Sequence, residues 1–217
     1  MESTSPAAPP GYVHKRPLFD NWTAFDNYPQ WLLLLWANLL ALLPLGGGVV
    51  LLWLPYQYYR FHGAALALWP NLALPLIWQI VWGVLIFIGS MLLHEWLHGL
   101  ALSFFGHQPR YAFLKLYFVA TIQKGSYLTR PQYLVMTLTP LVTMTLLGGG
   151  LLLFLPPVIG QLLLIALLLN TAASIGDLMV AWRVFLAPPE ARFSDDQGIQ
   201  LFLPVSHTQH HTPERIL

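Results

Sequence analysis

The chain has 217 residues, of which 56% are hydrophobic and only 9% are charged. Soluble domains carry about 25% charged residues, so this composition excludes an ordinary soluble domain and indicates an integral membrane protein. Ten Lys and Arg against nine Asp and Glu leave no surplus of positive charge for phosphates, and no nucleic-acid partner is expected. Cysteine is absent, which excludes disulfides, thiolate ligands and cysteine nucleophiles.

Composition divides the chain into three parts. Residues 1–28 hold Ser, Pro and charged side chains without the apolar run of a signal peptide, so we expect a disordered cytoplasmic N-terminal lead. Residues 29–189 are predominantly apolar and are expected to form one transmembrane domain. Residues 190–217 are expected to form a polar cytoplasmic tail, which ends in a His-rich segment.

Four apolar stretches of the transmembrane domain are each long enough to cross a bilayer as a helix. They cover residues 31–56, 74–105, 132–155 and 159–186. Pro44 and the glycines at 46–48 are expected to kink or break the first span. Residues 110–127 are rich in Tyr, Phe, Val, Thr and Ile, which predicts a hairpin-like extended loop at the membrane surface. The expected fold is therefore an all-α polytopic membrane protein with four transmembrane helices and a short β-like loop between spans two and three.

Basic residues indicate the orientation of these spans. With a cytoplasmic N-terminus, four spans leave Arg60 alone outside and place most other basic residues on the cytoplasmic side, as the positive-inside rule requires. The residues on that side are Lys15, Arg16, Arg110, Lys115, Lys124, Arg130, Arg192 and Arg215. Both termini are therefore expected in the cytoplasm.

The second span contains the pentapeptide His94-Glu95-Trp96-Leu97-His98. A charged side chain in mid-bilayer costs roughly 2–3 kcal/mol or more, so such residues usually serve a function. Positions i and i+4 share one face of a helix, so His94 and His98 can bind one ion while Glu95 reaches an attacking water. Two histidines, a zinc ion and a carboxylate base are the arrangement of metalloproteases. A satisfied polar cluster without metal is the weaker interpretation.

A third ligand is available in the fourth span. Asp177 is the only acidic residue between Leu141 and Leu186, and its distance from the cytoplasmic helix end matches that of the two histidines. A salt bridge with Arg183 or an interhelical hydrogen bond would also explain it. Asn170, seven residues earlier, shares its helical face and could contact substrate backbone or an oxyanion, or could simply hold two helices together.

These motifs resemble a known family. The pentapeptide, the segment 105–110, the pair Thr139-Pro140, and Asn170 followed by Gly176-Asp177 are similar to the putative zincin peptidase family of small bacterial four-span membrane proteins. The resemblance covers about 77–204. That family is distantly similar to site-2 proteases, in which two motif histidines and a later Asp hold zinc, the motif Glu is the base, and a β-like loop guides extended substrate.

The resemblance implies specific roles for residues of this chain. His94, His98 and Asp177 are expected to hold zinc, with Glu95 as the catalytic base, in a bacterial cytoplasmic membrane. The substrate is expected to be a membrane protein or peptide cleaved in or near the bilayer. Site-2 proteases usually carry a proline between the Asn and the Asp and a glycine after the Asp. Here no proline separates Asn170 from Asp177, and glycine precedes the Asp.

Other function classes explain fewer residues. A catalytically inactive adaptor would keep zinc for structure and present other membrane proteins. A di-iron membrane oxidase would use histidine boxes, and His207, His210 and His211 have the spacing of one box. The remaining histidines are scattered and cannot form a third box, and Glu95 and Asp177 would have no role. We therefore interpret the tail histidines as a solvated, adventitious metal-binding end. A transporter would need ligands spread through the membrane, whereas these lie at one depth.

Overall fold

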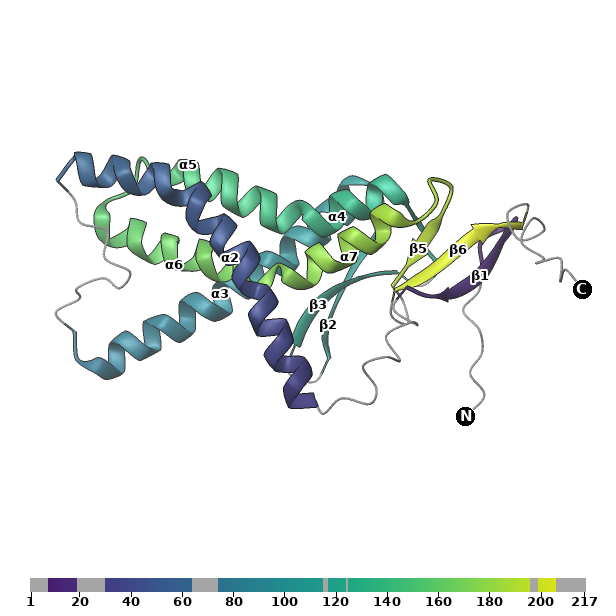
Figure 1. Cartoon of the computed structure of the whole chain (residues 1–217), viewed down its shortest axis with the longest axis horizontal. Coiled ribbons are helices and arrows are strands. Elements are labelled where there is room, and N and C mark those ends of the chain that lie inside the picture. The colour runs from purple at the N-terminus through teal and green to yellow at the C-terminus, as the bar shows by residue number, and fades with distance from the viewer. Residues whose placement is uncertain are drawn as a thin grey trace, which may run out of the picture.

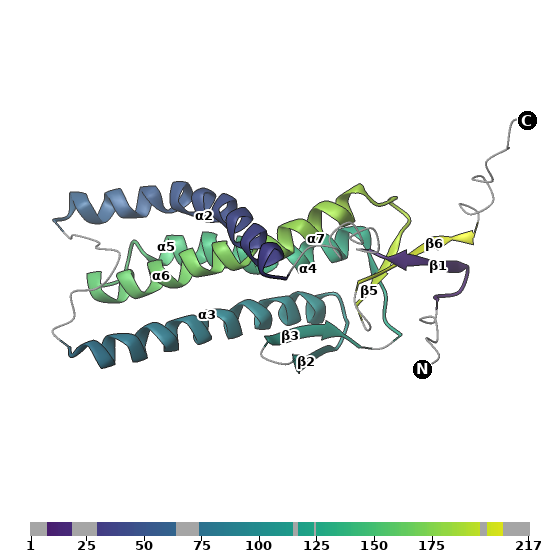
Figure 2. The ribbon, with the colours of Figure 1, turned by 60° about the horizontal axis from the view of Figure 1, so that its bottom comes forward.

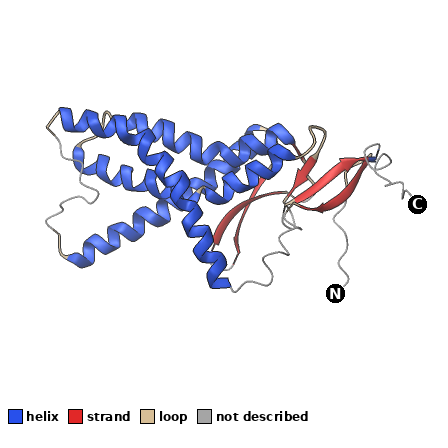
Figure 3. Ribbon diagram, in the orientation of Figure 1, coloured by secondary structure: helices blue, strands red, loops and turns tan. Residues whose placement is uncertain are grey.

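The structure is a computed structural model that describes residues 8–18, 30–63, 74–114, 117–123, 125–195 and 199–205. It is mostly helical, with two small antiparallel sheets gathered toward one end of the helices (Figure 3). The expectation of a mostly helical protein is therefore confirmed. The all-α class was too narrow, because strands form near both ends of the chain as well as in the predicted loop.

The helices follow the predicted apolar stretches closely. They are α2 (Gln30–Phe61), α3 (Leu76–Phe104), α4 (Arg130–Thr143), the π-helical turn η2 (Met144–Gly148), α5 (Gly149–Leu151), α6 (Pro157–Ala173) and α7 (Ile175–Leu186). Three helical segments are long and apolar enough to cross a membrane, namely Leu39–Phe61, Leu76–Phe104 and Arg130–Leu151. The pair α6 and α7 adds a fourth if it counts as one span.

Helix α2 passes through both of its prolines without a break. Pro44 and Pro55 lie inside the helix, and the glycines at 46–48 are helical as well. Proline removes one hydrogen bond and crowds the carbonyl four residues earlier, so a helix bends at such a residue. Figure 1 shows α2 changing direction along its length. Of the two predicted outcomes, the kink and not the break is therefore observed.

The fourth predicted span is interrupted, which corrects the expectation of one helix over 159–186. Helices α6 and α7 meet at Ser174, where the chain bends by 42°. The Ser174 hydroxyl and the Ser174 amide both donate to the carbonyl of Asn170, at 2.8 and 3.0 Å. Serine side chains compete in this way with the helical ladder and bend helices, which accounts for the break.

The predicted hairpin is present. Strands β2 (Pro109–Leu114) and β3 (Tyr117–Ile122) pair antiparallel from Pro109 opposite Ile122 to Leu114 opposite Tyr117. Figure 2 shows this hairpin beside the C-terminal part of α3. The predicted β-like loop between the second and third apolar helices is thus confirmed.

A second sheet joins the two ends of the chain. Strands β1 (Tyr12–Pro17), β6 (Gln200–Pro204), β5 (Arg192–Ser194) and β4 (Leu128–Thr129) lie in that order, and all neighbours are antiparallel. Residues 12–17 were expected to be disordered, and this expectation is wrong. The side chains of Phe193 and Phe202 are completely buried, and burying each stabilises the fold by about 1.5–3 kcal/mol, which anchors the sheet that β1 joins. The tail histidines lie outside the described residues.

Buried side chains form two hydrophobic clusters along the helices. One surrounds the ends of α3 and α7 and the second sheet, and includes Leu102, Met136 and Phe193. The other lies between α2, α3 and α6, and includes Leu97 and Met144. Helices α3 and α4 pass from one cluster into the other, so the polar residues of the motif lie at the junction between two apolar cores.

Candidate metal centre

His94 and His98 lie on successive turns of α3, and both are buried. Their ring centroids are 4.9 Å apart with nearly perpendicular planes. The spacing of four residues places both rings on the face that α3 turns toward α4 and α6. The prediction that the two imidazoles lie side by side is therefore confirmed.

Each histidine has its Nδ1 atom held by a protein oxygen. His94 Nδ1 lies 2.8 Å from Asn170 Oδ1, and His98 Nδ1 lies 2.9 Å from the carbonyl oxygen of Met136. The other end of the Asn170 amide, Nδ2, donates to the carbonyl of Pro140 at 3.5 Å, which fits this orientation of the amide. Both oxygens only accept, so Nδ1 carries the proton in each neutral ring. Nε2 is therefore the atom that each ring offers to a metal.

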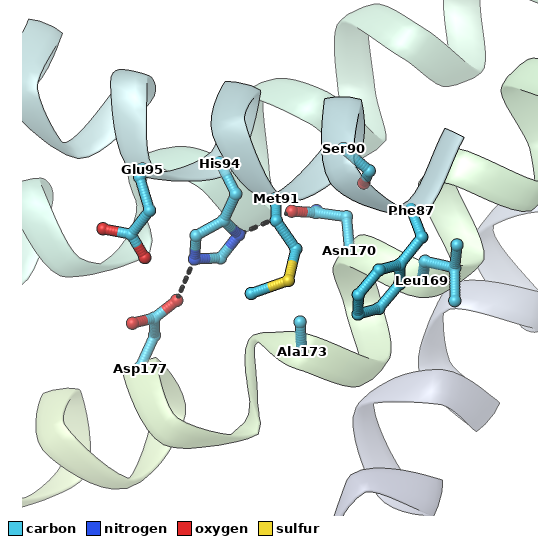
Figure 4. Close-up of a pocket in the computed structure, with 9 residues that line it drawn as sticks. All are labelled: Phe87, Ser90, Met91, His94, Glu95, Leu169, Asn170, Ala173 and Asp177. Atoms are coloured by element: carbon cyan, nitrogen blue, oxygen red, sulfur yellow. Dashed lines mark hydrogen bonds and ion pairs between the residues drawn. The ribbon is translucent and has the colours of Figure 1, made fainter. Parts of the chain in front are cut away.

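Asp177 lies opposite both Nε2 atoms. Its Oδ2 is 3.0 Å from His94 Nε2 and its Oδ1 is 3.5 Å from His98 Nε2 (Figure 4 shows the first contact). Ligand atoms about 2.0–2.1 Å from one tetrahedral zinc ion lie about 3.3 Å from one another. The separations between the carboxylate and the two rings thus match those of ligands that share one ion.

One oxygen of the Asp177 carboxylate, the buried Oδ2, lacks a hydrogen-bond donor among the described residues. The nearby Nε2 atoms bring lone pairs, because the protons reside on Nδ1. A buried acceptor without a donor costs about 1–3 kcal/mol, and a cation between the carboxylate and the rings removes that cost. The residues present fit a divalent metal ion.

The break at Ser174 positions Asp177. Ser174 is the N-cap of α7, and Asp177 lies in the first helical turn. The N-terminus of a helix carries a partial positive charge that favours a carboxylate there. The same break lets Asn170, at the end of α6, reach the Nδ1 side of His94 while Asp177 reaches its Nε2 side. His94 is thereby clamped between two residues that come from consecutive helices.

Pro140 explains how Met136 holds His98. In an uninterrupted helix the carbonyl of Met136 would accept from the amide of residue 140, but proline has no N–H. That carbonyl instead accepts from His98 Nδ1. Pro140 also offers its own carbonyl to Asn170, which holds the other histidine. One proline in α4 therefore supports both rings, through the Met136 carbonyl for His98 and through Asn170 for His94.

Glu95 approaches the same site from beside the histidines. One of its carboxylate oxygens lies within 4.8 Å of a ring nitrogen of each histidine. Its Oε2 accepts the amide N–H of Ala120 in β3 at 2.9 Å. Asp177 is closer to both rings, so Asp177 is the better third ligand and Glu95 is placed to handle protons. Two residues further along β3, the amide of Ile122 donates to Asp195 Oδ1 at 3.0 Å. This hydrogen bond connects the hairpin to the segment that follows β5 of the second sheet.

Gly99 leaves space for a tyrosine from the hairpin. A Cβ at this position would collide with the side chain of Tyr111, whose hydroxyl packs against α3 here. Gly99 is one turn after Glu95, so the phenol lies beside that carboxylate. Burial, and then the negative charge of Glu95, raise the pKa of Tyr111 above its usual value. The phenol is therefore neutral and able to donate at any physiological pH.

The structure brings all of the predicted site residues together. Glu95 lies near both histidines, and Asp177 faces both of their Nε2 atoms, as spacing and depth predicted. Asn170 was expected to contact substrate or an oxyanion, whereas both ends of its amide contact protein groups here. Sequence reasoning missed Met136, Ala120 and Tyr111. The first two act through backbone atoms, which carry no side-chain signal, although the proline four residues after Met136 could have indicated its carbonyl.

Comparison with known proteins agrees with this geometry. Residues 87–192 match the model of a family described as putative zincin peptidase. The matched segment contains the complete pentapeptide, the hairpin, Pro140, Asn170 and Asp177. Searches of curated proteins and of solved structures gave no match. The resemblance noted from the motifs is thus confirmed, because the segment that matches the putative zincin peptidase family carries all of these residues.

Proposed function

We propose that this protein is a zinc-dependent peptidase that hydrolyses a peptide bond of a membrane protein or peptide in or near the bilayer. The observation that carries the proposal is the Asp177 carboxylate, with its buried oxygen Oδ2, facing two imidazole Nε2 atoms whose Nδ1 atoms are both held by oxygens. Metal-binding histidines almost always have such an Nδ1 partner. An arrangement of three acceptors without a donor is unfavourable unless a cation is present.

His94, His98 and Asp177 hold the zinc ion in this proposal. When bound, zinc would acidify a water molecule and polarise the scissile carbonyl. Glu95 accepts a proton from the attacking water and passes it to the leaving nitrogen as the C–N bond breaks. The carbonyl carbon gains the hydroxyl, so one water is consumed for each bond cleaved. Tyr111, a neutral donor beside Glu95, is placed to hydrogen-bond the substrate.

The helix arrangement supports four membrane spans. Followed from α2 to α7, the chain alternates in direction between the sheet end and the opposite end of the helices (Figure 1). The broken pair α6 and α7 then acts as one span, and the terminal strands β1 and β6 lie on the side of the sheets. Elements at that end carry Arg110, Arg130 and Arg192, whereas Arg60 lies in the last turn of α2 at the other end. The positive-inside rule assigns the sheet end to the cytoplasm.

Metal content and hydrolysis together test the proposal. Purified wild-type protein should contain about one zinc, and His94→Ala and Asp177→Ala should lose it because each removes a ligand. Glu95→Gln should keep zinc and lose hydrolysis of unfolded membrane peptides, since only the base is removed. His62→Ala, at an exposed histidine directly after α2, is the matched control and should keep both properties.

Two results would overturn parts of the proposal. Wild-type protein that binds no zinc at micromolar concentrations would refute the metal centre. Zinc binding with the same cellular effect in wild type and Glu95→Gln would refute hydrolysis, and would instead favour an adaptor that uses zinc for structure.

A further inference from the structure

A cavity of about 150 Å³ lies beside the candidate metal centre. Figure 4 shows it between α3 and α6, with the carboxylates of Glu95 and Asp177 at one end. The lining residues come from three helices and are Phe87, Ser90, Met91, His94, Glu95, Leu169, Asn170, Ala173 and Asp177. The cavity is thus continuous with the residues assigned to chemistry.

The walls away from the metal centre are apolar and come in two helical pairs. Phe87 and Met91 are one turn apart on α3, and the same face continues to His94 and Glu95. Leu169 and Ala173 are one turn apart on α6 and form the opposite wall. At a rise of about 1.5 Å per residue, Phe87 lies about 10 Å along the helix axis from His94. The cavity therefore extends from the metal centre toward the N-terminal half of α3.

The polar residues in these walls already have protein partners. Ser90 donates its hydroxyl to the carbonyl of Ala166 at 3.1 Å. Asn170 is engaged at both ends of its amide, with His94 and with Pro140. A charged or amide side chain placed here would lose its water without gaining a partner, which costs several kcal/mol. The wall chemistry selects an apolar occupant.

The volume limits the size of that occupant. An apolar cavity of about 150 Å³ in another protein binds benzene, so a Phe or Leu side chain fits this volume and the larger indole of Trp does not. Ala173 lines the cavity on the α6 side, near Asp177, so a larger residue there narrows the cavity. Because Ala173 is exposed, this change does not crowd a buried core.

We propose that this cavity is the specificity pocket, which receives the side chain next to the scissile bond and selects medium-sized apolar residues such as Leu, Met and Phe. The inference rests on the proposed function, because it assigns a substrate class to that same site. Small side chains are disfavoured at this position because they make fewer contacts. Charged side chains are disfavoured because they lose their water, and the indole of Trp is disfavoured because of its size.

Cleavage of a randomised apolar peptide library, with the sites read by mass spectrometry, tests the pocket. Wild type should enrich Leu, Met and Phe at one position beside the cleaved bond. Ala173→Phe should shift that preference toward Ala by at least about tenfold, because a single methylene in an apolar pocket is worth that much. Met91→Ala should admit Trp. Val158→Phe and Leu92→Ala, which alter exposed positions outside the cavity, are the matched controls and should leave the preference unchanged.

A binding measurement separates this inference from the proposed function. Peptides carrying photo-leucine are irradiated with the Glu95→Gln protein, and the cross-linked residues are mapped. Cross-links to Phe87 or Met91 that disappear in Ala173→Phe and persist in Val158→Phe support the pocket even if no peptide is hydrolysed. Hydrolysis by wild type whose flanking preference does not change in Ala173→Phe and Met91→Ala would overturn the pocket and leave the peptidase intact.

Discussion

Both halves of α3 are rich in large apolar residues, but only the second carries the polar motif, and their surroundings differ. From Leu76 to Gly89 no side chain is buried, although nearly all are large and apolar. From Ser90 onward seven residues are buried, and all of them except Gly99 follow the pattern i, i+4, i+7, i+8, i+11, i+12 of one helical face. The second half is enclosed by α4, α6 and the β2–β3 hairpin. The protein therefore encloses only the part of the helix that carries the polar motif, and leaves the rest for lipid.

The largest expected difference between the two halves of α3 is the effect of a substitution on zinc affinity. His98→Ala removes a ligand from the enclosed half, and should weaken zinc binding by more than the roughly 10–100-fold that loss of an outer partner costs. Val84→Ala removes an exposed apolar group from the other half, and should change stability by less than about 0.5 kcal/mol with zinc binding unchanged. Zinc titration and thermal unfolding in detergent measure both. Equal losses from the two substitutions would contradict the division of α3.

The support that α4 gives to the enclosed half is the next largest effect. Pro140→Ala supplies an N–H that competes for the carbonyl of Met136, so His98 loses its partner and zinc affinity should fall about 10–100-fold. The free energy of unfolding without metal should rise, because proline costs a helix interior up to about 3 kcal/mol relative to alanine. Pro55→Ala, in α2, should raise stability without affecting zinc. Undiminished zinc affinity in Pro140→Ala would show that the proline has no positioning role.

Two glycines of α3 provide a matched pair. Gly99→Ala places a methyl group where Tyr111 packs, and should destabilise the protein by about 1–3 kcal/mol as the hairpin is displaced. Gly89→Ala meets nothing within 4 Å, and should stabilise by up to about 1 kcal/mol through helix propensity. Equilibrium unfolding in detergent measures the two free energies. The same sign for both variants would mean that the hairpin does not pack on α3 as described.

The smallest expected effect is a shift in the pKa of Tyr111. Burial and then the Glu95 charge raise this pKa, so the neutral phenol persists to higher pH than usual. In Glu95→Gln the charge is gone, and the pKa should fall toward its ordinary value while burial keeps it elevated. Phenolate absorbance, taken as the difference from Tyr111→Phe in the same background, measures the change. A pKa that stays constant or rises in Glu95→Gln would place Tyr111 away from the carboxylate.

The sequence predicted which side chains meet at the site better than it predicted where the backbone bends or pairs. The spacing of His94 and His98 and the matching depth of Asp177 were sufficient to predict their meeting, because helical geometry converts spacing into position. The hairpin was visible in the β-branched and aromatic composition of 110–127. The break at Ser174 was not predicted, because it depends on hydrogen bonds to the carbonyl of Asn170 that many serines in helices also form.

The terminal sheet shows a second limit. The segment 12–17 is short and mostly polar, and it forms a strand only because it pairs with the edge of β6. The two strands are far apart in the sequence, since His14 contacts Gln200, 186 residues later. Pairing over such a distance has no local signature in a single sequence. Phe193 and Phe202, which the structure buries completely, could have indicated a packed segment in the tail that was predicted to be polar.

X-ray absorption at the zinc edge of the purified protein tests whether His94, His98 and Asp177 share one zinc ion. We expect a shell of about four nitrogen and oxygen ligands at about 2.0–2.1 Å with two imidazoles, and loss of the imidazole signal in the double variant His94→Ala, His98→Ala. A shell without imidazole, or one that is unchanged in that double variant, would contradict it.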